Sequence, residues 1–196
     1  MAPLSKRQQA NAVAVLRAGG VVVYPTETAY GIGCDARDGV AVRELYRIKG
    51  REKKKPLAVI AADLAMVKRF FQLDSAALLL AKQDWPGPLT MVLATRDVRM
   101  QKALGRKQIG VRVSSHPVAA ALSKALGAPI VSTSANASGG KNCYSVSAVQ
   151  RSLGSAVSGV AVLDGGALPP RKPSTLVVFR RGVPVVLRQG SVRIGT

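Results

Sequence analysis

Hydrophobic and polar positions alternate along the chain with two different periods. Apolar residues recur every three to four positions in some segments, as in amphipathic helices, and run together in others, as in buried strands. The helical pattern covers residues 5–18, 38–50, 64–71 and 76–84, and a further helix begins at Pro117. The strand pattern covers residues 21–24, 57–61, 89–95, 109–113, 129–132, 160–163, 174–179 and 183–188. This alternation predicts an α/β fold with a mixed parallel and antiparallel sheet flanked by helices.

Local signals mark where several of these elements begin and end. Ser5 followed by Gln8 forms a capping box for the first helix, and Asp38 can cap the second, which ends at Gly50. Arg-Arg-Gly at 180–182, between the last two strands, predicts a hairpin. Because no repeat or linker-like stretch interrupts the alternation, we expect one domain over residues 1–196.

The charge of the chain is far from balanced. Lysine and arginine number 29 against 10 acidic residues, which gives a formal net charge of +19, while 47% of the 196 residues are hydrophobic. Such a surface attracts anionic partners, and the apolar content suffices for a large core. Only two cysteines occur, and no apolar run approaches the ~20 residues of a membrane span, so we expect a cytoplasmic protein with no membrane partner.

The residue types exclude several common chemistries. The single histidine, His116, has no cysteine or histidine cluster around it, so no protein-bound metal is expected, and a Ser-His-Asp hydrolase would lack its G-x-S-x-G motif. We expect His116 to occupy a strand-to-helix turn. Gly-Lys-Asn at 140–142 does not match a P-loop. GIGCDA at 31–36 fits a relaxed dinucleotide-binding pattern, but it lies past the end of its strand, so we interpret its glycines as turn and close-approach positions.

Polar groups gather instead at the ends of the predicted strands. Each group alone could be an ordinary turn, since Ser, Thr, Asn and Gly dominate turns. Strand ends meet at ligand sites in open α/β sheets, so we expect these groups to converge on one cavity. The groups are residues 26–28, 49–55, Arg112, 132–136, 174–175 and Arg188.

Seven segments, in this order, resemble the YrdC-type threonylcarbamoyl-AMP synthases. They are YPTETAYGIGCDA, KGREKKKPL, PGPLTMVL, VRVSSHP, STSANASG, PST and LRQGSV. The likeness runs from about residue 8 to residue 192, and its most specific parts are K-x-R (Lys49, Arg51) and S-x-N (Ser134, Asn136). The chain resembles the short, single-domain form of the family.

The resemblance implies a fold and a reaction. Family folds are a twisted mixed sheet around a large basic cavity. The family reaction joins L-threonine, bicarbonate and ATP into threonylcarbamoyl-AMP and releases pyrophosphate. Other proteins then transfer the threonylcarbamoyl group to an adenosine of certain tRNAs, which gives N6-threonylcarbamoyladenosine. We expect Mg²⁺ to arrive on the ATP phosphates, because the acidic residues form no cluster in the sequence.

The resemblance also assigns residues to the site. We expect Lys49 and Arg51 to be catalytic by neutralising phosphate charge. The threonine contacts it implies are Thr28, Arg112 and Ser134. The ATP contacts it implies are Lys49, Arg51, Lys55, Asn136, Ser174 and Arg188.

Some positions remain open at this stage. Glu27 could orient a neighbouring Lys or Arg, or it could lie near the threonine amine. Gly31 and Gly33 are expected to let the backbone approach the ligand. Where many family members carry other residues, this chain has Lys55, Ile60 and Gln108. The basic loop 49–56 and residues 137–145 are candidate lids.

An alternative function is an RNA-binding or ribosome-maturation factor of the same fold that makes no adenylate. The charge of +19 favours it, because phosphate neutralisation dominates nonspecific affinity for nucleic acids. Aromatic residues make up only 4% of the chain, which argues against base stacking. Basic residues expected outside the cavity could contact tRNA under either reading: Lys6, Arg7, Lys68, Arg69, Lys102, Arg106 and Lys107.

Overall fold

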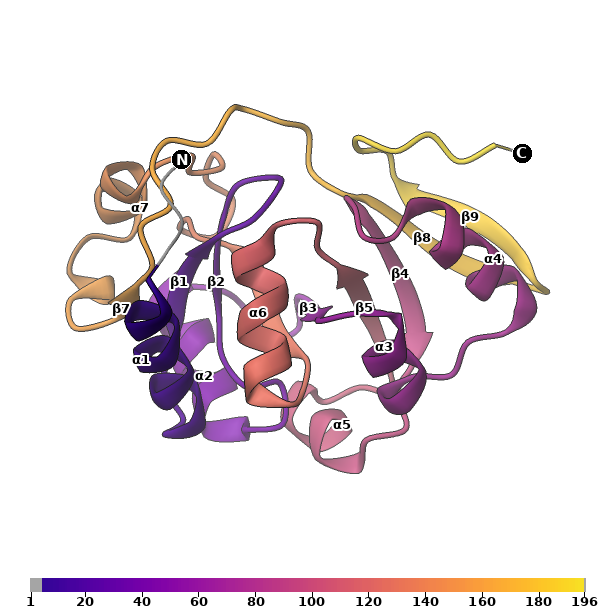
Figure 1. Ribbon diagram of the computed structural model, residues 1–196, viewed down its shortest axis with the longest axis horizontal. Helices are drawn as coiled ribbons and strands as arrows, with labels where there is room; N and C mark the ends of the chain where they lie inside the picture. Colours follow the sequence, from indigo (N-terminus) through magenta and orange to yellow (C-terminus); the bar gives the residue numbers. More distant parts are fainter. Residues whose placement is uncertain (1–4, 196) are drawn as a thin grey trace.

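The computed structural model describes residues 5–195 and has the α/β architecture expected from the sequence (Figure 1). The helices are α1 (Lys6–Arg17), α2 (Gly39–Lys49), α3 (Leu64–Phe70), α4 (Ser75–Asp84), α5 (Val98–Leu104), α6 (Pro117–Leu126), α7 (Val146–Leu153) and the 3₁₀ turn η1 (Gly154–Val157). The strands are β1 (Val22–Pro25), β2 (Tyr30–Gly33), β3 (Ala58–Ala61), β4 (Leu89–Ala94), β5 (Gln108–Val113), β6 (Ile130–Ser134), β7 (Ala161–Val162), β8 (Thr175–Arg180) and β9 (Val183–Arg188).

The strands of the described chain form one mixed sheet. Its order is β7-β1-β2-β6-β3-β5-β4-β8-β9, with β7 at the left and β9 at the right of Figure 1. The pairs β1–β7, β3–β5 and β4–β8 are parallel, and the other neighbours are antiparallel. Most residues of the central strands are buried, as their apolar runs predict.

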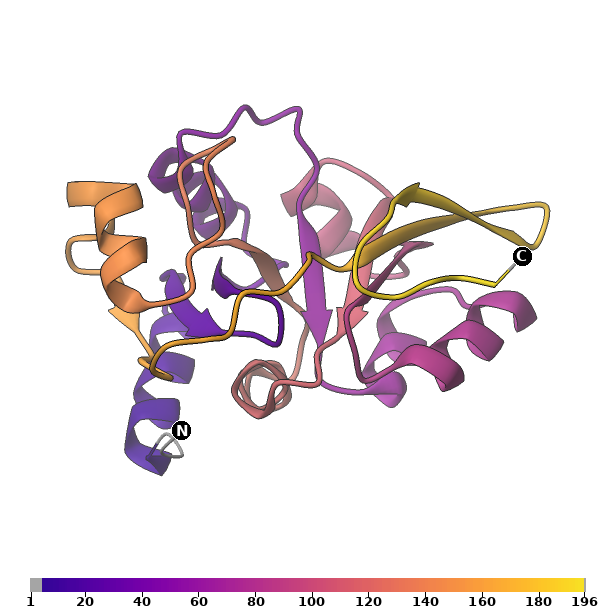
Figure 2. The same ribbon diagram turned by 90° about the horizontal axis from the view of Figure 1, so that it is seen from above.

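Helices cover the two faces of the sheet unequally. Figure 2 shows α1, α3, α4 and α6 on one side, while α2, α5 and the connection after α2 lie on the other. On the first side α6 packs against β1 and β3, and α1 packs against α6. On the second side α2 packs against α5, and the sheet beside them is left open.

The predicted start and stop signals are confirmed. The Ser5 hydroxyl accepts a hydrogen bond from the amide of Gln8, whose side chain returns one to the Ser5 amide, so both halves of the capping box form. The Asp38 carboxylate caps α2, and Gly50 ends it in the left-handed conformation, with φ of 56°. The 181–182 turn joins β8 to β9 as an antiparallel hairpin.

Four elements were missing from the prediction, one of them the short 3₁₀ turn η1. Residues 30–33 form β2 rather than a glycine turn, so the sheet has one strand more than the eight predicted. The helices α5 and α7 were also missed, because each is short and begins inside a polar stretch. The predicted domain limits, residues 1 and 196, lie outside the described residues.

Candidate active site

A cavity of about 570 Å³ lies over the open face of the sheet. Alternate residues of β5 line it, namely Gln108, Gly110 and Arg112, as expected when one face of a strand forms the floor. The rim is formed by the β1–β2 connection, by the loop after α2 and by the end of β9. Residues from the predicted strand-end groups therefore do converge on one cavity.

Four arginines line this cavity: Arg51, Arg106, Arg112 and Arg188. Within residues 5–195 no carboxylate is part of the lining. The placement of Arg106 outside the cavity was wrong, because the unpredicted helix α5 ends at Leu104 and turns the next residues toward the cavity. The arrangement suits a ligand with several negative charges.

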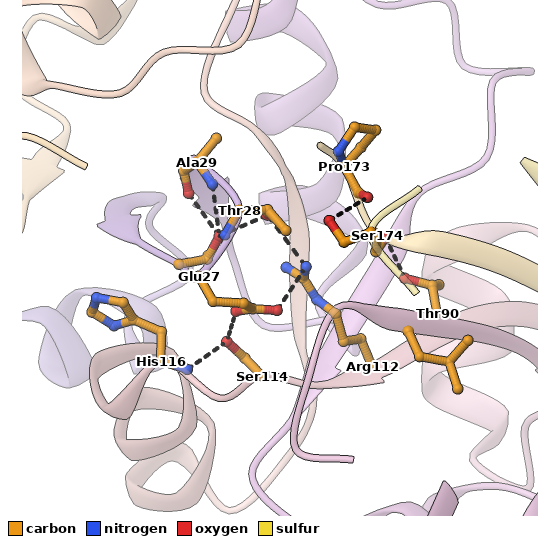
Figure 3. Close-up of polar contacts among 12 residues, drawn as sticks. Glu27, Thr28, Ala29, Thr90, Arg112, Ser114, His116, Pro173 and Ser174 are labelled. Atoms are coloured by element: carbon orange, nitrogen blue, oxygen red, sulfur yellow. Dashed lines mark hydrogen bonds and ion pairs between the residues drawn. The ribbon is translucent and has the colours of Figure 1, made fainter. Parts of the chain in front are cut away.

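At one end of the cavity Arg112 is held by the β1–β2 connection (Figure 3). Its Nη1 lies 3.0 Å from Glu27 Oε1 as an ion pair and donates a 3.3 Å hydrogen bond to Thr28 Oγ1. The Ser114 hydroxyl donates to Glu27 Oε2. Both members of the ion pair are buried, with side chains 10% and 7% exposed for Arg112 and Glu27. Of the two roles left open for Glu27, the structure shows contact with a neighbouring arginine.

His116 occupies the strand-to-helix turn predicted for it. It is the N-cap of α6, and its Nδ1 accepts a 3.3 Å hydrogen bond from the Val118 amide. Burial lowers the pKa of His116, although the negative charge of Glu27 opposes this. In the part of the chain that the structure describes, no group of three or more His, Cys, Asp or Glu side chains could hold a metal ion.

At the end of β6, the S-x-N motif lies against the lysine of K-x-R. Ser134 lines the cavity, and its main-chain oxygen accepts a hydrogen bond from Lys49 Nζ. The same ammonium group donates to the carbonyl of Asn136 at 2.6 Å. The Asn136 side chain donates to the Gly140 carbonyl at 2.6 Å and is only 4% exposed. Neither Lys49 nor Asn136 is part of the cavity lining. Both instead hold main-chain segments next to the lining in place through their hydrogen bonds.

Burial of the charged Lys49 ammonium group costs free energy. The pKa of Lys49 is lowered to about 8, first by burial and then by the positive charge of Arg51. Two carbonyl acceptors offset part of this cost, because a buried cation needs partners for its donors. Through these two contacts the Lys49 side chain joins the β6 end to the C-terminus of α2.

The loop after α2 is held at its backbone. Arg106, Tyr46 and Arg51 donate to the carbonyls of residues 54, 55 and 56, at 3.3, 3.0 and 3.0 Å. Burial raises the pKa of Tyr46, and the positive charges of Arg106 and Arg51 offset part of this rise, which places both cations near the phenol. The Nε atoms of Arg51 and Arg106 are buried and have no hydrogen-bond partner within the described chain.

Lys55 points away from this arrangement. Its Nζ forms a 3.2 Å ion pair with Glu52, and its side chain is 48% exposed. It is not part of the cavity lining. A surface ion pair of this kind contributes little to stability, so the side chain is free to move to another anion.

At the β8–β9 end, Ser174 and Arg188 lie in contact. The Arg188 Nη2 donates to the Ser174 carbonyl at 2.9 Å and to its hydroxyl at 3.2 Å. The Ser174 and Thr90 hydroxyls are 2.8 Å apart (Figure 3). Burial, and then the positive charge of Arg112, lowers the pKa of Arg188, and both arginines line the cavity.

The two glycines of β2 serve different purposes. Gly31 lines the cavity, as expected. The ligand approach predicted for Gly33 was wrong: a Cβ there would lie 1.8 Å from the Val131 carbonyl oxygen, so Gly33 lets β2 pack against β6.

Sequence reasoning missed two lining residues of interest. Thr90 is a hydroxyl inside an otherwise apolar strand, and that contrast was a usable signal. Arg106 gave no such signal, because its position depends on α5. Gln108 and Ile60 line the cavity, so these differences from the family pattern affect the site directly.

Comparison with known proteins gives consistent matches. A family model named for Sua5, YciO and YrdC, described as "Telomere recombination", matches residues 14–190. A threonylcarbamoyl-AMP synthase of Thiobacillus denitrificans is 40% identical over 86% of this chain and 89% of its own length. One from Halorhodospira halophila is 43% identical over 75% and 78%. One from Bacillus subtilis is 34% identical over 94% of this chain, which spans 54% of that protein.

Solved structures agree with these matches. P. abyssi Sua5 complexed with L-threonine has a TM-score of 0.87 and 31% identity, over 96% of this chain and 56% of that one. E. coli YciO has a TM-score of 0.81 and 33% identity, over 95% and 90%. None of the helices between residues 5 and 195 has the length and apolar character needed to cross a membrane.

Proposed function

Because the chain belongs to the Sua5/YciO/YrdC family, we propose that it is a threonylcarbamoyl-AMP synthase, which makes threonylcarbamoyl-AMP and pyrophosphate from L-threonine, bicarbonate and ATP. The observation that carries this proposal is the one cavity in which Arg112, Thr28 and Ser134 lie together with three further arginines. Hydroxyls and a guanidinium fork suit a small amino acid, and the other arginines suit a polyphosphate.

The chemistry needs positioning and charge neutralisation. The neutral amine of threonine attacks the carbon of bicarbonate or of carbon dioxide derived from it, so an N–C bond forms and, from bicarbonate, water is lost. A carbamate oxygen then attacks the α-phosphorus of ATP, and the bond to the β-phosphate oxygen breaks as pyrophosphate leaves. Fixed cations around the phosphates lower the barrier because charge develops on oxygens that they already face.

We assign the threonine to the Arg112 end of the cavity. Arg112 is buried and can bind a carboxylate with its two-pronged guanidinium. The Thr28 hydroxyl accepts from Arg112, and Ser134 faces the same space from β6. The P. abyssi Sua5 structure complexed with L-threonine supports threonine as the amino-acid substrate.

We assign the ATP phosphates to Arg51 and the nucleotide end to Arg188 and Ser174, all of which line the cavity. Arg106 joins Arg51 as a phosphate contact, since both lie beside Tyr46. Lys49 and Asn136 act as positioning residues, because their polar groups are used on main-chain carbonyls. Lys55 is an exposed cation of the loop after α2, and it reaches phosphate only if its ion pair with Glu52 opens.

We propose that Mg²⁺ enters with ATP. The described lining of the cavity offers hydroxyls, amides and arginines but no carboxylate, so it does not fit a metal held by the protein. Phosphate oxygens and water then supply the ligands of the ion. The residues' own task is to orient the triphosphate.

The product is proposed to serve tRNA modification in the cytoplasm, by one domain spanning residues 1–196. Transfer proteins and tRNA are the partners that this reaction requires. The large positive charge fits an RNA partner. The alternative of an RNA-binding factor without synthase activity is not favoured, because the matched curated relatives are named synthases.

The test is pyrophosphate release from MgATP by the full chain. We expect release that requires both bicarbonate and L-threonine and falls sharply with L-valine or L-serine. Release that ignores the amino acid, or none from folded protein, would refute the proposal. Retained tRNA affinity in that case would point to the RNA-binding alternative.

A further inference from the structure

Glu27 is an acidic side chain placed next to a site that must bind a carboxylate. A negative charge there would repel the substrate unless it served another purpose. The proposed reaction gives Glu27 no role of its own. Its contacts, however, are specific: one oxygen faces Arg112 and the other accepts from Ser114.

The carboxylate of Glu27 does not reach the ligand space. Glu27 is not part of the cavity lining, whereas its neighbours Thr26 and Thr28 are. Its Oε1 is buried and pairs with Arg112 as an ion pair without the geometry of a hydrogen bond. Since Glu27 does not line the cavity, we expect no direct contact between its carboxylate and the amine of a bound amino acid.

A chain of hydrogen bonds fixes Glu27 from behind (Figure 3). The His116 amide donates to Ser114 Oγ at 3.2 Å, and the Ser114 hydroxyl then donates to Glu27 Oε2. Since His116 also caps α6, this chain joins the carboxylate to the start of a helix that packs on the sheet. The anchor is rigid, which a surface carboxylate would not be.

On the side of Glu27 that faces the cavity, the series of polar contacts continues to Arg112 and Thr28. Among the described residues, hydrogen bonds and ion pairs of Arg112 involve only Nη1, which faces Glu27 and Thr28. This leaves Nε and Nη2, one edge of the planar guanidinium, for a carboxylate. Thr26 donates its hydroxyl proton to the Ala29 carbonyl at 2.7 Å, so Thr28 is the donor in their 3.1 Å contact. Arg112 and Thr28 are thus both oriented before a ligand arrives.

We propose that Glu27 is a positioning residue for substrate carboxylate binding: anchored by Ser114, it holds Arg112 so that the free guanidinium edge faces the cavity. The inference rests on the proposed function for the identity of the amino acid. It predicts that a change at Glu27 affects threonine binding and leaves ATP binding nearly unchanged. The reason is that Glu27 acts on the Arg112 end of the cavity and not on the Arg51 and Arg106 end.

The test compares two Glu→Gln variants. Glu27→Gln removes the charge from a buried pair, and Glu44→Gln removes it from an exposed pair with Arg47 on α2, which serves as the matched control. We expect Glu27→Gln to raise both the KM and the calorimetric Kd for L-threonine about 10-fold or more, because outer-layer partners of a binding group typically matter at that level. The KM for ATP should change less than about twofold, and Glu44→Gln should change neither value.

A second variant and a stability measurement separate positioning from folding. Ser114→Ala should raise the threonine KM by a smaller factor in the same selective way, because it loosens Glu27 without removing its charge. Thermal stability of Glu27→Gln, Arg112→Lys and the double variant should show coupling between the two sites, whether or not threonine is the substrate.

The outcomes distinguish this inference from the proposed function. If the wild type neither binds nor uses threonine, the proposed function fails. If the wild type uses threonine but Glu27→Gln leaves its KM unchanged, lowers it, or raises both KM values equally, the positioning role is refuted. A lower KM for threonine would mean that the negative charge of Glu27 only reduces the attraction of Arg112 for the substrate carboxylate.

Discussion

At one end of the cavity Arg112 contacts a buried carboxylate and a hydroxyl, whereas at the other Arg51 and Arg106 donate to main-chain carbonyls of an exposed basic loop. The two ends lie along β5, whose four steps from Gln108 to Arg112 span about 13 Å. The first end is enclosed, since its ion pair is at most 10% exposed. The second carries side chains such as Lys54, which is 83% exposed.

This difference fits the two kinds of ligand. A small amino acid offers few groups, so its binding site has to be oriented in advance. A triphosphate offers many oxygens and can draw guanidinium groups away from neutral carbonyls, because charge-assisted hydrogen bonds are the stronger ones. We therefore expect the amino-acid end to be rigid and specific and the loop end to adapt when the nucleotide binds.

The largest expected effect is at the enclosed end. Arg112→Lys keeps the charge but loses the planar fork, so kcat/KM for threonine should fall about 100-fold. The control is Arg99→Lys on the exposed side of α5, which should match the wild type. Steady-state kinetics with varied threonine checks this. A fall of less than about threefold would contradict a rigid, fork-dependent site.

Lys49, at the C-terminus of α2 and outside the cavity lining, gives the next effect through its titration. The folded-state pKa of about 8 lies below the unfolded value of 10.5, so the unfolded chain binds more protons between these values and stability rises with pH there. Relative to Lys49→Met, the wild type should gain about 2 kcal/mol between pH 7.5 and 9.5. Chemical unfolding of both proteins at each pH measures this.

Subtracting the variant is necessary because other groups titrate in the same range. Burial raises the pKa values of Cys34 and Cys143, which lowers stability as pH rises above the unfolded thiol pKa. The Cys34 contribution is common to both proteins, whereas the Cys143 contribution differs, because the positive charge of Lys49 lowers the pKa of Cys143. Parallel stability curves for wild type and Lys49→Met would show that the ammonium group is not buried as the structure has it.

The smallest expected effect is at the loop end of the cavity, where Arg51 and Arg106 lie. Arg106→Ala should raise the KM for ATP about 10-fold and leave the KM for threonine unchanged, because it removes one of several phosphate cations. Lys107→Ala is the matched control, since this neighbouring lysine is exposed and outside the cavity lining. Equal effects of the two substitutions would mean that only general positive charge matters at this end.

Much of the fold was predictable because its signals are local. The capping box at Ser5, the cap at Asp38 and the stop at Gly50 depend on residues close in sequence, and all three form. The strand β2 was not predictable in this way. Its second glycine, Gly33, is explained only by Val131, which lies about one hundred positions away and approaches Gly33 across the sheet.

The candidate site, like the fold, could be predicted only in part. The motifs identified lining residues such as Thr28, Arg112 and Arg188, because each follows or ends a strand with a recognisable pattern. They did not distinguish residues that line the cavity from residues behind it, and Lys49, which donates to main-chain carbonyls, is outside the lining. That distinction depends on side-chain direction, which tertiary packing decides.

The most direct test of the account is to identify the product. The full chain would be incubated with L-threonine, MgATP and ¹³C-bicarbonate, and the nucleotide product would be analysed by mass spectrometry. We predict an adenylate that contains threonine and one ¹³C atom, formed in step with pyrophosphate. An unlabelled threonyl adenylate, or pyrophosphate released without any carbamoylated nucleotide, would contradict the account.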